Sequence, residues 1–277
     1  MTTLTAAPSR AGVRATTTNF YFYMALSCAA VAFLGFAPTF WFPLATHSFK
    51  ANPIVYVHGT VFFAWTLFFC FQTWLAASGR VMNHRAVGLI GISFATAMTI
   101  FGTLAAINSM KMAALGGMKD EGIAFAIVPL SGIAFFAVVF ALAVIKVRDG
   151  EAHKRLMLLA GISILDAAVA RWFIFFLAPP GPVGPPPVPV TIPPALVAYL
   201  LLVVAIVFDW RRRGRPHPVY IYGGIVLVAL KLLNLPISMS AGWHAFAGGN
   251  SYPRAVVSVA RATFCRSFKS CPRSRCC

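Results

Sequence analysis

Residues 53–78 read PIVYVHGTVFFAWTLFFCFQTWLAAS and contain no Asp, Glu, Lys or Arg. About 20 consecutive apolar residues form a helix long enough to cross the roughly 30 Å hydrocarbon core of a bilayer, so this stretch predicts a transmembrane helix. The chain carries further stretches of this kind at residues 20–43, 86–108, 122–146, 154–178, 193–208 and 220–240. The sequence therefore predicts an all-α fold, a polytopic helical membrane bundle of about seven transmembrane helices.

Composition supports a single membrane domain. Apolar residues make up 59% of the 277 residues and charged residues only 10%, whereas soluble domains contain about 25% charged residues. No segment between the apolar stretches is long enough to fold alone, which leaves a membrane domain at 20–248, an N-terminal segment at 1–19 and a tail at 249–277. The net charge of +17 lies in short loops and in the tail, so it predicts contact with a lipid bilayer and no nucleic-acid partner.

The basic residues divide unevenly between the two sides of the predicted bundle. In membrane proteins, Lys and Arg gather in cytoplasmic loops. One side holds twelve of them: Arg10, Arg14, Arg80, Arg85, Lys146, Arg148, Lys154, Arg155, Arg211, Arg212, Arg213 and Arg215. The loops of the other side hold three: Lys50, Lys111 and Lys119. We therefore expect a cytoplasmic N-terminus, an uncleaved first helix and insertion into a bacterial inner (plasma) membrane.

Two segments depart from the apolar pattern. Residues 179–194 hold nine prolines, which cannot continue a helix and favour an extended polyproline conformation. We interpret them as an external strap between two helices, either a stiff spacer or a docking segment for an external partner. The tail at 249–277 is rich in Arg, Ser and Cys, fits no zinc pattern and is expected to be disordered. It is interpreted as a disulfide-bonded external segment or as an out-of-frame translation.

Four ionisable side chains lie within the predicted transmembrane helices. His58 lies near the outer end of its helix, Asp166 and Lys231 lie near mid-membrane, and Arg171 lies in the outer half. Groups at this depth are costly, so they indicate a functional site or a pair that neutralises itself. We expect Asp166 to pair with Lys231 or with Arg171, and His58 to lie beside Arg171. This polar network is interpreted either as an ion pair that fixes helix packing or as a proton or anion site with a titrating histidine.

Further polar groups extend this network along the helices. His58, Trp65 and Gln72 are spaced seven residues apart, so they line one face of their helix. His244, which follows the last predicted helix, is a candidate outer partner for His58, with His47 as its competitor.

Two more histidines lie at the predicted cytoplasmic rim, each just before a transmembrane helix. His84 is followed by Arg85, and His153 is followed by Lys154. Two imidazoles from neighbouring helices can bind a haem iron axially, and basic residues can pair with haem propionates. The alternative is that both histidines are interfacial residues among the anchors of the positive-inside pattern.

Two sets of residues resemble a family of bacterial multispan membrane proteins whose activity is not established. The sets are Val57-His58-Gly59, Gln72, Arg80, His84-Arg85 and Gly88, and then Ala152-His153-Lys154-Arg155-Leu156-Met157 with Arg171. In that family a His opens one helix, a His-Arg pair precedes the next, and a His-Lys-Arg-x-Met motif leads a helix that carries an Arg. The resemblance covers residues 53–175. The family's paired histidines are in turn similar to those of diheme b-type membrane cytochromes, which implies haem as a cofactor.

Three functional hypotheses follow from these residues. The first is a haem- or redox-associated membrane protein that uses His58, His84, His153 and His244. The second is a small-solute or proton transporter built around Asp166, Arg171, Lys231 and His58. The third is a non-catalytic membrane scaffold or an assembly partner of another membrane protein. The chain has no Gly-rich phosphate loop, nucleophile elbow, H-E-x-x-H pair or C-x-x-C-H haem-attachment motif, so it predicts no catalytic residue and no separate metal site.

Overall fold

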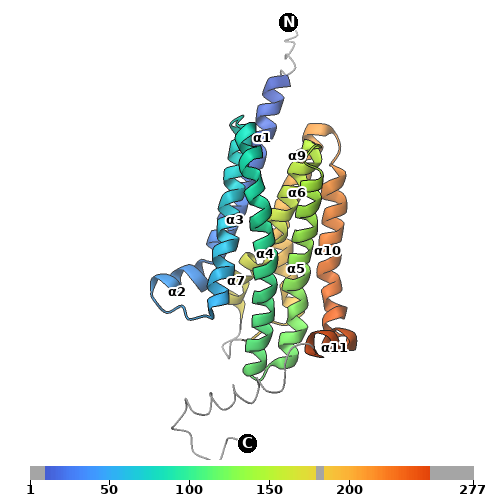
Figure 1. The fold of residues 1–277 in the computed structure, drawn as a ribbon. Coiled ribbons are helices and arrows are strands. Elements are labelled where there is room, and N and C mark those ends of the chain that lie inside the picture. Colours follow the sequence, from blue (N-terminus) through green and yellow to red (C-terminus); the bar gives the residue numbers. More distant parts are fainter. Residues whose placement is uncertain (1–9, 179–183, 250–277) are drawn as a thin grey trace, which may run out of the picture.

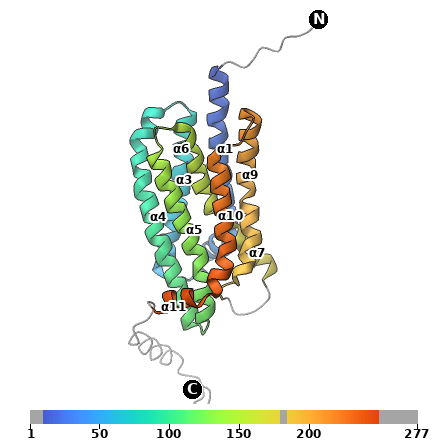
Figure 2. The ribbon, with the colours of Figure 1, turned by 90° about the vertical axis from the view of Figure 1, so that its right-hand side faces the viewer.

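The computed structural model describes residues 10–178 and 184–249, with side chains from residue 19 onward. In this part of the chain the long elements run along one common direction (Figures 1 and 2). They are α1 (Arg10–Gly35), α3 (Pro53–Ala77), α4 (Val81–Leu115), α5 (Lys119–Ile145), α6 (Gly150–Ser163), α7 (Asp166–Leu177), α9 (Leu200–Arg213) and α10 (Pro218–Met239). The short elements are the π-helix η1 (Ala37–Trp41), α2 (Phe42–Ala45), the 3-10 helix η2 (Val188–Thr191), α8 (Ile192–Ala198) and α11 (Ala241–Gly249).

The described helices are those of a membrane protein. Six spans are long and apolar enough to cross a bilayer, and a seventh exists if Asn19–Gly35 and Ala37–Ala45, which meet at a bend of 43°, count as one. The outside of the bundle exposes large apolar side chains such as Leu89, Val138 and Ile145. Soluble proteins rarely leave so much apolar surface uncovered. The prediction of an all-α polytopic membrane bundle is confirmed.

Helix α6 lies in the middle of the bundle, where it packs against α1, α5, α9 and α10. Residues 158–163 of this helix are all buried, which is typical of a helix covered on every side. Its continuation α7 packs against α1, and glycine makes this approach close. A Cβ at Gly35 would lie 2.6 Å from the backbone oxygen of Ala168, so only glycine fits this contact.

Two predicted continuous helices are interrupted. The helix predicted at 154–178 breaks at Ile164 and Leu165, between α6 and α7, and the one predicted at 193–208 breaks at Tyr199, between α8 and α9. Asp166 is the first residue of α7, and its Oδ1 accepts a hydrogen bond from Ala167 N at 2.7 Å. Local bonds of this kind let an Asp side chain compete with a continuous helix.

The proline-rich segment is not extended throughout. Of residues 179–194, the first five lie outside the described residues, and residues 188–194 are wound into η2 and the start of α8. The prediction of an extended strap is therefore wrong for this part. Prolines at the first positions of a helix remove no hydrogen bond that the helix needs, and Val188, Thr191 and Pro194 are buried in the bundle. The predicted Cys-rich tail, from residue 250 onward, lies outside the described residues.

One end of the bundle gathers the basic loops. The start of α1, the turn between α3 and α4, the turn between α5 and α6, and the loop between α9 and α10 all lie at the top of Figure 1. We refer to this end, with residues 78–85, 146–155 and 209–217, as the basic end. The opposite end holds α2, α11 and the turn between α4 and α5 (Figure 1).

Candidate functional site

His84 of α4 and His153 of α6 come together at the basic end. Their ring centres lie 6.3 Å apart, and the ring planes are nearly perpendicular, at 80°. The prediction that both histidines precede their helices is wrong, because α4 begins at Val81 and α6 at Gly150. The cap of α6 accounts for its early start: Asp149 Oδ1 accepts hydrogen bonds from Glu151 N and Ala152 N at 3.1 Å each.

Backbone carbonyl groups hold both imidazoles. His84 Nδ1 lies 3.2 Å from Gln72 O of α3, and His153 Nδ1 lies 2.8 Å from Ala143 O of α5. A carbonyl oxygen only accepts, so each Nδ1 carries a proton and donates it. In the neutral imidazole the lone pair is then on Nε2, which is the arrangement of metal-ligating histidines held by an outer-shell carbonyl. Four helices thus fix the positions of the two imidazoles.

Gln72, whose backbone carbonyl binds His84, has a buried side-chain amide. Gln72 is 7% exposed, and neither its Nε2 nor its Oε1 has a hydrogen-bond partner among the described residues. An unpaired buried amide costs about 1–3 kcal/mol. Within the same described residues, no group of three His, Cys, Asp or Glu side chains is placed to hold a metal ion. Within the described residues, the site therefore offers two imidazoles as ligands.

A buried ion-pair network lies next to His153 on the same helix. Arg155 is 1% exposed and donates from Nε to Asp209 Oδ2 at 2.7 Å and from Nη2 to Asp209 Oδ1 at 2.6 Å. Its Nη1 donates to Glu151 Oε2 at 2.7 Å, and the same carboxylate oxygen accepts from Arg213 at 2.9 Å. Sequence reasoning assigned Arg155 to a basic loop and Asp209 to no site, because both residues lie at the edges of apolar stretches.

Asp166 pairs with Lys231 in the middle of the bundle. Lys231 Nζ lies 2.5 Å from Asp166 Oδ2, so of the two partners considered for Asp166 the structure brings Lys231 to it. Near this pair on α10, Asn234 Nδ2 donates to Ser131 Oγ at 3.0 Å. The pair lies where α6 ends and α7 begins.

His58 and Arg171 lie in the half of the bundle away from the basic end. Arg171 is near enough to act electrostatically on His58, and its guanidinium lies 5.4 Å from the centre of the Phe36 ring. His58 Nδ1 is buried without a hydrogen-bond partner, and Arg171 has no ion pair among the described residues. His58 and Arg171 are therefore neighbours, as the sequence predicted, and their polar groups are incompletely paired.

His244 does not join either histidine site. Its Nε2 lies 2.9 Å from Ser238 O, and its helix α11 packs against α5 and α10. His58 lies on α3, which packs against α1 and α4. The structure therefore leaves His244 on the opposite flank of the bundle from its expected partner (Figure 1).

Comparison of the chain with protein-family models, with curated proteins and with solved structures gives no match. The site is therefore interpreted from its own geometry.

Proposed function

We propose that this protein is a membrane-embedded one-electron carrier in which His84 and His153 would hold a haem group. The observation that carries this proposal is the placement of the two rings, 6.3 Å apart, with each Nδ1 bound to a carbonyl oxygen. Two imidazoles this close together could both serve as ligands of one haem group.

The donor set favours haem over a bare metal ion. Two imidazoles leave a zinc ion short of its usual four ligands, whereas a porphyrin brings four nitrogens of its own and needs only axial ligands. When bound, haem supplies reversible one-electron transfer. Arg85 follows His84 in the chain and has no ion pair among the described residues, so we propose it as a partner for a haem propionate.

The residues of the chain have distinct tasks in this proposal. The carbonyl groups of Gln72 and Ala143 accept the Nδ1 protons, which fixes the ring orientations and makes each Nε2 a stronger ligand. The resemblance to bacterial multispan membrane proteins with paired histidines is consistent with this assignment. Following the bias of Lys and Arg, we place the basic end in the cytoplasm and the protein in a bacterial inner membrane.

A second candidate function is proton or small-solute transport through the Asp166–Lys231 site. The observation in its favour is the ion pair itself, which lies inside the bundle where α6 ends and α7 begins. Ionisable residues within membrane spans often belong to ion or proton pathways. An intramembrane carboxylate at a break can bind and release a proton or a cation.

An absorption spectrum of the purified protein tests the haem proposal. We expect a Soret band and reduced bands typical of a low-spin iron with two imidazole ligands. His84→Ala and His153→Ala should each abolish the same spectral species, because this iron loses its low-spin state when either ligand is removed.

His58→Ala and His244→Ala are matched controls, since each removes one histidine elsewhere in the bundle. Both should leave the spectrum unchanged. A colourless wild-type protein without iron would rule out the proposal. Loss of colour in the His58 variant alone would move the redox centre to the opposite end of the bundle.

A further inference from the structure

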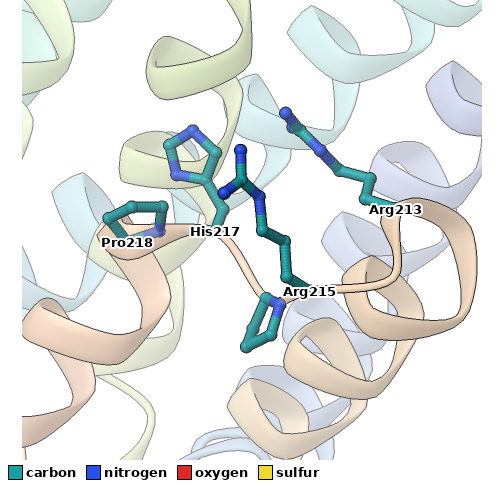
Figure 3. Close-up of a pocket in the computed structure, with 5 residues that line it drawn as sticks. Arg213, Arg215, His217 and Pro218 are labelled. Atoms are coloured by element: carbon teal, nitrogen blue, oxygen red, sulfur yellow. The ribbon is translucent and has the colours of Figure 1, made fainter.

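A cavity of about 240 Å³ opens at the basic end, in the loop that joins α9 to α10 (Figure 3). Its lining residues are Arg213, Arg215, Pro216, His217 and Pro218. Cavities that hold drug-sized ligands measure about 300–1,000 Å³, so this one suits a smaller group. Figure 3 shows the side chains of Arg213, Arg215 and His217 extending to the same side of the loop. This cavity is separate from the histidine pair, and the inference does not depend on haem.

Positive charge is in excess around the cavity. Glu151 accepts from Arg213 at 2.9 Å, from Arg155 at 2.7 Å and from Lys154 at 2.5 Å, so this one carboxylate is shared among three cations. Arg215 has no ion pair among the described residues. An anion in the cavity would give Arg215 its missing partner and would relieve the sharing of Glu151.

The start of α10 adds to the positive electrostatic potential around the cavity. His217 is the N-cap of α10, and its Nδ1 accepts a hydrogen bond from Val219 N at 3.2 Å. The positive end of the α10 dipole therefore faces the same loop that carries the two arginines.

Aromatic residues place the cavity at the depth of lipid headgroups. Trp210 is 62% exposed one turn before the loop, and Tyr222 is 70% exposed one turn after it. Exposed Trp and Tyr near the ends of transmembrane helices are typical of the membrane–water interface. A basic cavity between two spanning helices at this depth is suited to an anionic lipid headgroup.

We propose that this cavity binds a phosphate group and that the headgroup of an anionic membrane lipid supplies it. Arg215 and Arg213 contact the phosphate oxygens, and the start of α10 contributes its positive end. Arg213 is shared between the phosphate and Glu151, which links the bound lipid to the Glu151–Arg155 network of α6.

The test uses the full chain, purified in neutral detergent and titrated with phosphatidylglycerol, with phosphatidylcholine or with inorganic phosphate. Bound lipid is counted by native mass spectrometry, and binding is also followed by the rise in melting temperature. We expect one tightly held phosphatidylglycerol per chain. In Arg215→Gln its affinity should fall about tenfold, since a charge-assisted hydrogen bond is lost.

Arg212→Gln is the matched control. It removes the same charge three residues earlier in the chain, but the Arg212 guanidinium lies 5.7 Å from the centre of the Phe208 ring and does not line the cavity. Its affinity for phosphatidylglycerol should equal that of the wild type. Equal losses of affinity in Arg215→Gln and Arg212→Gln would show that general surface charge attracts the lipid. That result would overturn the proposal of a specific site. If the protein binds inorganic phosphate but does not prefer phosphatidylglycerol to phosphatidylcholine, the proposal that an anionic lipid supplies the phosphate group is wrong.

Discussion

Two ion pairs inside this bundle are built in different ways. Arg155 and Asp209 are each 1% exposed, and two hydrogen bonds join them at the basic end. Lys231 and Asp166 share one contact, Asp166 is 21% exposed, and the contact lies at a break between two helices. Planar two-point pairing fixes geometry, whereas a single contact to a flexible lysine leaves freedom to rearrange. We therefore interpret the Arg155–Asp209 pair as a structural clasp that holds two helices together. We interpret the Asp166–Lys231 pair as a site able to exchange partners.

The largest effect is expected from breaking the Arg155–Asp209 pair. Arg155→Met leaves Asp209 buried without its cation, which should cost about 3–5 kcal/mol of unfolding free energy. The double change Arg155→Met and Asp209→Leu should recover much of this loss, because apolar pairs of similar volume replace buried ion pairs at little cost. Denaturant unfolding of the purified protein in micelles measures the free energy of unfolding of both variants. A double variant no more stable than Arg155→Met would contradict the role of a clasp.

A smaller effect is expected at the Asp166–Lys231 pair. Asp166→Asn removes one charged hydrogen bond from a partly exposed site, so it should cost about 1.5–3 kcal/mol. Adding Lys231→Met should restore part of that loss, and additivity of the two single effects would argue against pairing.

The same substitution separates the two candidate functions. Asp166→Asn should leave any haem spectrum unchanged, because Asp166 lies at the helix break and not at the basic end. If the pair is a proton site, this variant should abolish proton uptake by proteoliposomes. If Asp166→Asn takes up protons at the wild-type rate, Asp166 has no role in transport and serves only in helix packing.

The two pairs also differ in how far the sequence predicted them. Asp166 and Lys231 stand out because an ionisable residue inside an apolar stretch is rare. Arg155 lies among Lys and Arg residues, and Asp209 directly precedes Trp210 and three arginines, so composition cannot distinguish either from a solvated charge. Their burial follows from the central position of α6, which depends on the packing of the whole bundle.

Helix interruptions were the other feature that the sequence did not predict. The number and order of the spans follow from apolar length alone. The breaks at Ile164, Leu165 and Tyr199 occur at residues that carry no proline or glycine signal. Likewise, the motifs around His84 and His153 marked both residues, but their 6.3 Å separation depends on where α4 and α6 begin and on how they are held by α3 and α5.

The smallest effect is expected at His217, which is more exposed than the Arg155–Asp209 pair. Partial burial, together with the cations Arg155 and Arg213, lowers the pKa of His217 below its ordinary value, against the opposing influence of Asp209 and Asp149. The unfolded chain therefore binds a proton at a higher pH than the folded chain does. Stability contributed by the neutral imidazole is present above about pH 6.5 and is lost as the pH falls below that value.

The loss should stay under about 1 kcal/mol, because solvent screens a half-exposed group in this loop. His217→Asn retains a side-chain acceptor for Val219 N–H while removing the titrating ring, so it serves as the reference. The difference in melting temperature between wild type and His217→Asn, measured from pH 7.5 to pH 5, isolates this group from the other histidines. A difference independent of pH would show that the imidazole does not titrate in this range in the folded protein. A bound phosphate favours the protonated ring. Saturating phosphatidylglycerol should therefore reduce the pH dependence of the melting temperature in the wild type and leave that pH dependence unchanged in His217→Asn.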